Sequence, residues 1–417
     1  MTKKAYVIGA GLAGLSAATV LAQRGVAVSV IEAAGQAGGR CRSYFDAGFG
    51  GVIDNGNHCI LTGNQAAFGY LHRIGAADRV HGSPVPEKDF FDLATGAHWT
   101  IRPNPGRLPT WLFDVRRRVP GTVPADYLEV VKLLWAPPDR CIGDVMSCKG
   151  PLWERLLQPF FLGALNTKPQ EASAALAGVL VRKTFLRGGH AYRTRIAHPT
   201  LAHAFVDPAL AYLKQHGAEV RLGQRLRVLV LDGGQAIALE FPDGTVPLKP
   251  SDMVVLAVPP WVAKDLVPGL QTPDDFRAIV NAHFKYPAPP GASPMLGVIG
   301  GTAEWIFTFS DRISVTVSGA DAIVDQDRED LAVAIWADVT KALDIKAPLP
   351  VWQIVKEKRA TIAATPAQDA KRPGAATRWR NLFLAGDWTQ TGLPGTIEGA
   401  IQSGESAGVL ARKHLSL

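Results

Sequence analysis

Short apolar runs and one small-residue stretch alternate over the first part of the chain. Residues 6–8 form an apolar run of the kind that a buried parallel strand needs, and residues 26–31 form a second one. Between them, a helical pattern starts at a group of glycines. The pattern therefore predicts a strand, a helix and a second strand, which is the βαβ unit of an α/β fold.

Apolar runs later in the chain predict the other elements. Buried strands are expected at 253–259 and 381–387, and helices at 128–135, 153–166, 205–217 and 396–413. Further strands are expected within 219–231, at 352–361, and within 297–318, where two alternating runs flank a Ser-Asp-Arg turn. The alternating runs predict an antiparallel sheet outside the βαβ unit.

Three glycines lie between the first strand and the first helix. Gly9, Gly11 and Gly14 have the spacing G-x-G-x-x-G. Gly9 permits the tight turn, Gly11 lets the backbone approach a pyrophosphate, and Gly14 lets the helix pack close to the sheet. The second strand ends on Glu32, about 20 residues after Gly11, where a carboxylate can accept a hydrogen bond from a ribose hydroxyl. The motif therefore predicts a dinucleotide site at the helix N-terminus.

The same stretch has an alternative interpretation as an export signal or a membrane span. Residues 5–22 carry no charge and follow two lysines. Three glycines and Ser16 make a poor membrane helix, whereas the strand–turn–helix interpretation explains each glycine. We therefore expect a cytoplasmic protein whose four cysteines are reduced thiols.

Composition narrows the function classes. With 417 residues the chain is too long for one simple core and suits two domains. The cysteines form no C-x-x-C pair and no zinc spacing, so we expect no metal. The net charge of +7 suits an anionic surface, but no recognised nucleic-acid-binding module is present. We therefore exclude nucleic acid as a partner.

The segment after Glu32 continues into Gly38, Gly39 and Arg40. This extension resembles the flavoprotein superfamily of amine oxidases, protoporphyrinogen oxidases and carotenoid desaturases, and the resemblance implies that the dinucleotide is FAD. Arg40 suits the pyrophosphate because a guanidinium binds phosphate bidentately. The resemblance further implies that the backbone of Val228 contacts the adenine.

A second motif lies near the other end of the chain. Gly386 and Asp387 follow an apolar run, and a small-residue helix starts near Thr396 and Ile397. This resembles the second FAD motif of the superfamily. It implies that Asp387 binds the ribityl chain and that the helix N-terminus faces the pyrimidine edge of the flavin, where its dipole stabilises negative charge.

The resemblance also implies a two-domain organisation. The expected fold is α/β, with a discontinuous Rossmann-type FAD-binding domain at 1–72, 196–265 and 372–417. An α+β substrate domain with an antiparallel sheet is expected at 73–195 and 266–371.

The loop at 54–58 supplies candidates for proton transfer, because a D-x-G loop of the superfamily passes close to the flavin. We hypothesise that His58 supplies or relays a proton, and that the Asp54 carboxylate raises the pKa of His58 and orients it. The alternative is that these side chains brace the loop. For Asp54 we favour the bracing role. For His58 we hold the bracing role and the catalytic role as equal alternatives. Glu398 is the next candidate for the acid.

Several segments narrow the choice within the superfamily. Amine oxidases of the superfamily carry an aromatic side chain here that helps to enclose the amine. Residues 393–399 hold no aromatic side chain, so amine binding loses support. Long stretches resemble the squalene-associated hydroxysqualene dehydroxylase family, namely 54–58, 164–167, 172–176, 207–210, 315–318 and 378–389. The chain departs from the pattern of this family at Asn57, where the resemblance leads us to expect Gln. The resemblance implies reductive removal of the hydroxyl group of hydroxysqualene in hopanoid and squalene biosynthesis.

Other functions stay open beside this one. The alternatives are a carotenoid- or phytoene-type desaturase, an amine or protoporphyrinogen oxidase, and a non-enzymatic FAD-containing scaffold. The electron donor, the acid and the oligomeric state are not indicated by the sequence.

Residues 99–135 have a different character from the rest of the chain. Between Arg102 and Arg118 there are five arginines and one acid, Asp114, around the apolar triplet 111–113. Arginines beside Trp, Leu and Phe are typical of an interfacial docking segment. We therefore expect peripheral contact with the inner face of the cell membrane, with an ordinary core helix and a solvated basic face as the alternative.

Overall fold

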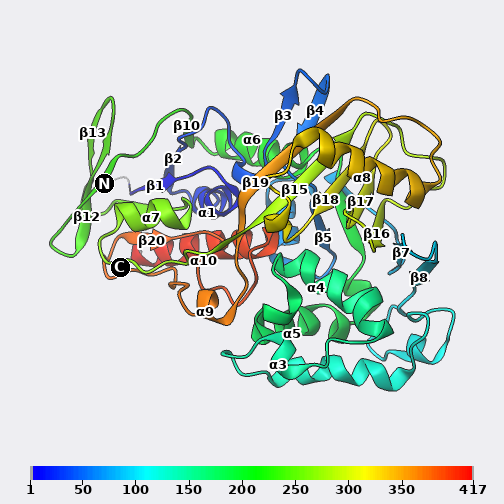
Figure 1. Ribbon diagram of the computed structural model, residues 1–417. Coiled ribbons are helices and arrows are strands. Elements are labelled where there is room, and N and C mark those ends of the chain that lie inside the picture. The colour runs from blue at the N-terminus through cyan, green and yellow to red at the C-terminus, as the bar shows by residue number, and fades with distance from the viewer. Residues whose placement is uncertain (1–2, 416–417) are drawn as a thin grey trace.

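A five-stranded parallel sheet forms one half of the molecule (Figure 1). The computed structural model describes residues 3–415. In spatial order the strands are β10 (Glu219–Arg221), β2 (Ala27–Ile31), β1 (Lys4–Ile8), β14 (Met253–Leu256) and β20 (Leu382–Leu384). All four pairings are parallel. The central strands are buried because helices cover both faces of such a sheet, so the predicted apolar runs are confirmed as its core.

The first and the last helix of the chain pack directly on each other. They are α1 (Leu12–Ala22) and α10 (Ile397–Leu415). A Cβ added at Gly404 of α10 would lie 2.1 Å from the carbonyl oxygen of Ala13, and the Ser16 hydroxyl donates to the carbonyl of Ile401 at 3.0 Å. The two helices therefore meet at backbone distance, which brings the two ends of the sequence together beside the sheet.

Shorter elements complete this half. The helices are α2 (Gln65–Arg73), α6 (Asp207–Gln215), α7 (Pro260–Leu266) and α9 (Pro366–Asp369). A small sheet of β11 (Val228–Asp232), β12 (Gln235–Phe241) and β13 (Gly244–Pro247) projects at the left of Figure 1. The hairpin of β3 (Ser43–Asp46) and β4 (Gly51–Asp54) rises at the top, and β5 (Cys59–Leu61) pairs with β9 (Thr194–Ala197), which pairs with β6 (Val80–His81).

A seven-stranded sheet forms the other half. Its order is β19 (Trp352–Ile362), β15 (Phe276–Phe284), β18 (Ile313–Val317), β17 (Trp305–Thr308), β16 (Met295–Ile299), β7 (Lys88–Asp92) and β8 (His98–Ile101). Every pairing is antiparallel except that of β16 with β7. The helix α8 (Arg328–Leu343) covers one face with a shared apolar core. The predicted antiparallel sheet is confirmed, including the turn at 310–312.

A helical unit packs against the far end of this sheet, at the lower right of Figure 1. It contains α3 (Ile142–Val145), η5 (Trp153–Leu157), α4 (Gln158–Leu165) and α5 (Ala174–Lys183), and its core includes Phe90 and Trp99 from the sheet. The predicted helix at 153–166 is confirmed, with one π-helical turn at its start. The predicted helix at 128–135 belongs to a longer 3-10 segment, η4 (Pro124–Trp135), which follows η3 (Thr110–Phe113).

The expected α/β fold with a dinucleotide-binding sheet and a second, largely antiparallel sheet is confirmed. All five strands of the parallel sheet come from the ranges expected for the FAD-binding domain, while the domain boundaries stay a prediction. Within residues 3–415, no helix combines the length and the apolarity that a bilayer crossing requires.

Candidate active site

The glycine loop between β1 and α1 leaves open space at the N-terminus of α1. Gly9 has φ +107, and a Cβ at Gly14 would lie 1.9 Å from the Gly9 carbonyl oxygen, so the turn and the close helix packing exclude side chains there. A Cβ at Gly11 would meet no heavy atom within 4 Å. The predicted turn at Gly9 and the close packing at Gly14 are thus confirmed, and the space above Gly11 is available for a ligand. The approach of a pyrophosphate to Gly11 stays a prediction.

A second glycine pair lies directly against this loop. Gly38 and Gly39 have φ +108 and +55, in the left-handed region that favours glycine. The Gly38 N–H donates to the Ala10 carbonyl at 2.8 Å, and a Cβ at Gly39 would lie 3.3 Å from the Cα of Gly11. This packing places the following residue, Arg40, beside the open space.

The predicted ribose acceptor, Glu32, lies at the end of β2, and its carboxylate binds backbone N–H groups on both sides. Its carboxylate accepts from the N–H of Ala10 at 2.7 Å and from the N–H of Ala34 at 2.8 Å. The Gln224 N–H donates to the Glu32 carbonyl at 2.8 Å, so the chain that leads into β11 runs beside this residue. Val228 is the first residue of β11. The contacts of Glu32 with ribose and of Val228 with adenine stay predictions.

The C-terminal motif meets the N-terminal one through an ion pair. Arg40 donates from Nη2 to Oδ1 of the buried Asp387 at 2.6 Å and from Nη1 to the carbonyl of Ala360 at 2.6 Å. The Asp387 carboxylate holds the pKa of Arg40 above its ordinary value. Next to Asp387, Gly386 has φ +152, and a Cβ there would lie 2.3 Å from Nε1 of Trp388. The two motifs predicted from opposite ends of the sequence therefore form one site.

The N-terminus of α10 is the second helix end that the sequence predicts at the cofactor. The Thr396 hydroxyl accepts from the N–H of Gly399 at 3.1 Å and so caps the helix, whose first residue is Ile397. A helix leaves its first N–H groups without intrahelical partners. α10 therefore offers N–H donors and a positive dipole end.

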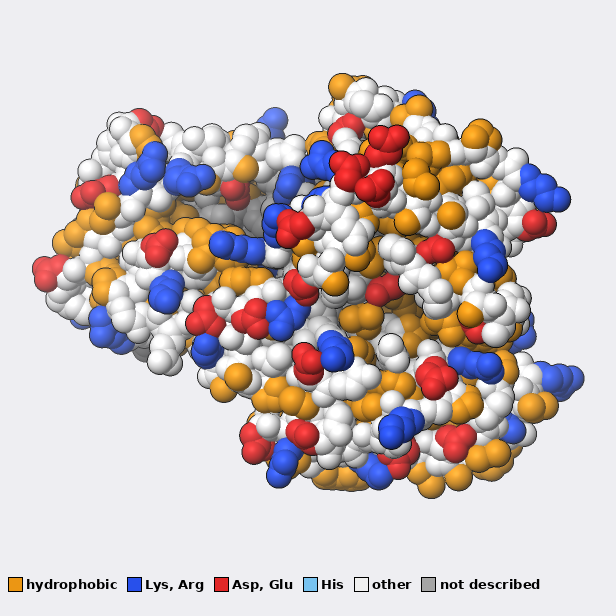
Figure 2. All heavy atoms as spheres, viewed as in Figure 1, with side chains coloured by type: hydrophobic (Ala, Val, Ile, Leu, Met, Phe, Trp, Pro, Cys, Tyr) orange, Lys and Arg blue, Asp and Glu red, His pale blue; other side chains and the backbone are white. Residues whose placement is uncertain are grey.

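Taken together, these groups fit a dinucleotide. The open space at Gly11 adjoins a helix N-terminus and a guanidinium, which is what a pyrophosphate requires. Figure 2 shows the molecule hollowed between its two halves, with Lys and Arg side chains at the edge of the hollow.

Asp54 braces the loop instead of orienting His58. Its buried carboxylate accepts from Oγ of Ser43 at 2.5 Å and from the N–H of Leu201 at 2.9 Å, and it lies 3.8 Å from Arg312. Burial is the main cause that raises the pKa of Asp54 above its ordinary value. These contacts support the bracing interpretation and give no support to a proton-transfer role.

His58 lies in a pocket beside β17, and most of the pocket wall is apolar. The lining residues are Asp54, Asn57, His58, Ile196, Ala197, Leu201, Phe307 and Phe309. Burial, and then the positive charge of Arg40, lower the pKa of His58 to about 4. The expectation that Asp54 raises this pKa is therefore wrong, because the carboxylate is bonded elsewhere and the charge that acts on the ring is a cation. At neutral pH the imidazole is uncharged.

Glu398, the next candidate for the acid, is used as a helix cap. Its oxygens accept from the N–H groups of Ala66 at 3.3 Å and Ala67 at 2.9 Å, in the first turn of α2. Lys183 lies 3.6 Å from the carboxylate. The contacts are those of a structural carboxylate, so they favour stabilisation of α2 over proton transfer.

A polar network beside His58 escaped the sequence analysis. Asn57 donates from Nδ2 to Oγ1 of Thr316 at 3.3 Å, and Thr316 donates to Oδ1 of Asn281 at 2.8 Å. His283 lies between Oγ of Ser314 at 2.8 Å and the carbonyl of Asp54 at 3.0 Å, and burial lowers its pKa to about 3.

A signal for this network exists in the sequence. Asn281 and His283 interrupt the apolar run of β15 at every second position, which marks one face of a strand. That face is turned away from the core shared with α8.

Comparison with known proteins shows the family to which the chain belongs. A family model described as flavin containing amine oxidoreductase matches residues 12–409. The chain belongs to this family. Hydroxysqualene dehydroxylases from Rhodopseudomonas palustris and Zymomonas mobilis are 53% and 46% identical to it, over 98% of this chain in both cases and over 98% and 99% of the relatives. A 15-cis-phytoene desaturase from Synechococcus elongatus is 24% identical over 98% of this chain and 96% of that protein.

Solved structures agree with this fold. A redesigned putrescine oxidase superposes with a TM-score of 0.71 at 16% identity, over 99% of each chain. An oxidoreductase from Methanosarcina mazei superposes with a TM-score of 0.69 at 15% identity, over 97% of this chain and 99% of that one. With the family and the geometry in agreement, FAD is the cofactor of this member.

Replacing Gly11 by Val should abolish FAD retention and leave the apoprotein folded. The backbone at Gly11 has φ −73 and free space around the added Cβ, so the fold tolerates the side chain while the pyrophosphate does not. Flavin absorbance of the purified variant measures retention, and thermal unfolding of the flavin-free protein measures the fold. Gly14→Ala is the contrasting variant, because its methyl group lies against the Gly9 carbonyl and should lower the Tm. A Gly11→Val protein at full flavin occupancy contradicts the assignment.

The low pKa of His58 predicts an acid-sensitive contribution to stability. In the unfolded chain histidine has a pKa of about 6.5, so protonation favours unfolding as the pH falls from about 6.5 towards 4. His58→Gln should therefore lose part of the decrease in unfolding free energy over this window. His98→Gln, at an exposed position, is the control and should follow the wild type. An unchanged slope in His58→Gln shows that the ring is not held neutral.

Proposed function

We propose that this protein removes the hydroxyl group of hydroxysqualene reductively and releases squalene and water. Bound FAD, reduced by an electron donor, would supply the hydride, and solvent would supply the proton with which the hydroxyl leaves as water. The observation that carries the proposal is the place of His58: it lies among mostly apolar side chains in a small pocket, and Arg40 of the cofactor site is close enough to lower its pKa. The names of relatives that are 46–53% identical over nearly the whole chain support the same reaction.

The pocket residues have separate roles in this proposal. Loss of an allylic hydroxyl as water leaves a carbocation, which water would capture. We assign to Ile196, Leu201 and Phe307 the exclusion of water from the reacting carbon, so that a hydride could reach it first. Because His58 is neutral at pH 7, we assign to it a hydrogen bond to the leaving oxygen and the relay of a proton, and not the storage of that proton. Asp54 and Glu398 stabilise the surrounding loop and helix.

A desaturase that oxidises a long isoprenoid is the second candidate, because the phytoene desaturase similarity covers almost the whole chain. The two reactions run in opposite directions of hydride transfer. Under anaerobic conditions, photoreduced enzyme should be reoxidised by hydroxysqualene in a single turnover, with squalene as the product. Oxidised enzyme should show no bleaching with squalene or phytoene. Bleaching by a hydrocarbon, without reoxidation by the alcohol, contradicts the proposal and supports the desaturase.

The same substrate class supports contact with a membrane, since a C30 hydrocarbon has negligible solubility in water. Large apolar side chains are exposed along η3, η4 and the segment before them; we define this docking surface as Leu108, Phe113, Leu128 and Trp135. Phe113 and Trp135 are 78% and 77% exposed. Hydrophobic side chains lie along the lower edge of the molecule in Figure 2, where Figure 1 places this segment.

The structure changes which residues of the segment can meet lipid. Trp111 is buried and packs edge-on against Tyr127 with ring centroids 5.6 Å apart, so its expected exposure is wrong. Arg118 donates to the carbonyls of Leu112 and Thr122 at 2.8 and 2.9 Å. Its guanidinium therefore stabilises the backbone of this segment. Arg116 is exposed, but its guanidinium pairs with the Asp114 carboxylate at 3.1 Å, which offsets part of the charge that would attract anionic lipid.

Replacing Phe113, Leu128 and Trp135 together by Ser should lower partitioning onto vesicles with anionic lipid by at least about tenfold, because each buried apolar side chain contributes about 1.5–3 kcal/mol. Co-sedimentation at several salt concentrations measures it, with flavin content as the folding check. Phe45→Ser is the matched control, since Phe45 is 68% exposed on the β3–β4 hairpin, at the opposite edge in Figure 1. Equal sedimentation of the triple variant and the wild type contradicts this surface.

A further inference from the structure

A buried arginine outside the cofactor cradle organises the loop between β20 and α10. The side chain of Arg372 has no exposed surface. Its Nε donates to the carbonyl of Thr389 at 3.0 Å, and its Nη1 donates to the carbonyl of Leu393 at 2.7 Å. Its Nη2 donates to the carbonyls of Asp387 at 3.0 Å and Thr389 at 2.6 Å and to the hydroxyl of Thr391 at 3.2 Å.

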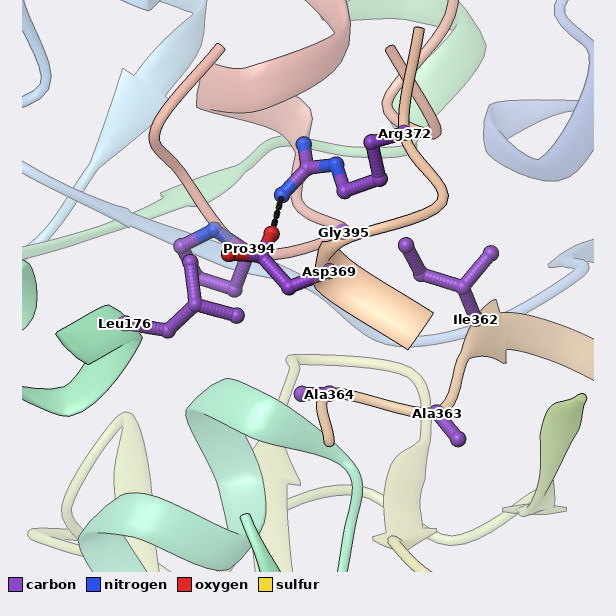
Figure 3. A pocket seen from close by; sticks show the side chains of 8 residues that line it. All are labelled: Leu176, Ile362, Ala363, Ala364, Asp369, Arg372, Pro394 and Gly395. Carbon is purple, nitrogen blue, oxygen red and sulfur yellow. Dashed lines mark hydrogen bonds and ion pairs between the residues drawn. The ribbon is translucent and has the colours of Figure 1, made fainter. Parts of the chain in front are cut away.

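The remaining bond anchors the guanidinium outside the loop. Nη1 of Arg372 donates to Oδ1 of Asp369, on α9, at 2.9 Å. Figure 3 shows this pair beside a small pocket that Leu176, Pro394 and Gly395 also line. The guanidinium thus spans from α9 to three carbonyls and one hydroxyl of the loop.

Only an arginine meets the demands of this position. Its planar group carries five N–H donors in a fixed fork, and all of its nitrogens are bonded here. A buried cation without such partners is strongly unfavourable, and carbonyl groups turned inward without a donor are unfavourable as well. The backbone conformation of 387–393 and the guanidinium therefore depend on each other.

This loop presents the flavin-binding groups of the C-terminal motif. It begins with Asp387, which pairs with Arg40, and it leads through Pro394 and Gly395 into the N-terminus of α10. A Cβ at Gly395 would lie 3.2 Å from Oδ2 of Asp387. A shift of the loop therefore moves both the carboxylate and the helix N-terminus.

We propose that Arg372 is a positioning residue of the FAD site, which holds the β20–α10 loop in the conformation that presents Asp387 and the α10 N-terminus to the cofactor. It acts through the loop and touches no cofactor atom, because it is fully enclosed by protein. The inference rests on FAD as the cofactor and not on the identity of the substrate.

The test compares FAD affinity and flavin potential in Arg372→Lys and Arg372→Met with the wild type. Lysine keeps the charge but presents three donors from one point, without the fork. Both variants should raise the FAD dissociation constant at least about tenfold. In holoenzyme reconstituted at saturating FAD, the flavin midpoint potential should become more negative, since a displaced α10 N-terminus stabilises the reduced, anionic flavin less. The matched control is Arg380→Lys, because Arg380 on the same segment is exposed and its side chain donates to Oε1 of Gln235 and not to the β20–α10 loop.

A second pair of variants keeps the proposal testable if the Arg372 variants do not fold. Asp369→Asn removes the charge that anchors the guanidinium, and Thr391→Val removes one loop acceptor. Each should weaken FAD binding severalfold, and the potential should shift in the same direction. A lower Tm of the apoprotein with an unchanged FAD dissociation constant and an unchanged potential, in either set, overturns the proposal and leaves Arg372 as a stabilising residue only. Neither readout depends on the substrate, so failure of the dehydroxylase proposal is recognised separately.

Discussion

The ion pair of Arg40 with Asp387 is the contact on which the site depends, because it joins segments 347 residues apart. Each partner follows a backbone conformation that favours glycine, at Gly39 on one side and Gly386 on the other. The packing of α1 on α10 brings these segments within reach, and Arg372 holds the loop that carries Asp387. The cofactor cradle therefore exists only when both ends of the chain have assembled on one sheet.

The division of the seven-stranded sheet into two faces determines what lies beside that cradle. One face forms an apolar core with α8. The opposite face is polar near the loop at 54–58, through Asn281 and Thr316, and aromatic under the helical unit, through Phe90 and Trp305. The polar part of this face holds the network of Asn281, Thr316 and His283 beside the loop at 54–58. In the aromatic part, Phe90 is buried in the core of the helical unit.

Features set by local backbone geometry could be predicted from the sequence, and features set by distant contacts could not. The glycine loop and Glu32 follow from what a strand–turn–helix requires, so their placement is confirmed. The pKa of His58 depends on burial and on Arg40, which approaches from a different loop. The sequence predicts that Trp111 is exposed, whereas in the structure it packs against Tyr127 in the core. Arg372 lies in a polar stretch whose importance appears only when the loop carbonyls converge on it.

A double-mutant cycle on FAD binding tests the central claim, that the two chain ends form one cofactor site through Arg40 and Asp387. The free energy of FAD binding is measured for the wild type, Arg40→Gln, Asp387→Asn and the double variant. If the two residues act as one unit, the loss in the double variant is smaller than the sum of the single losses by at least about 0.5 kcal/mol. Losses that add within about 0.3 kcal/mol would show that the two motifs bind the cofactor independently, and would contradict the account.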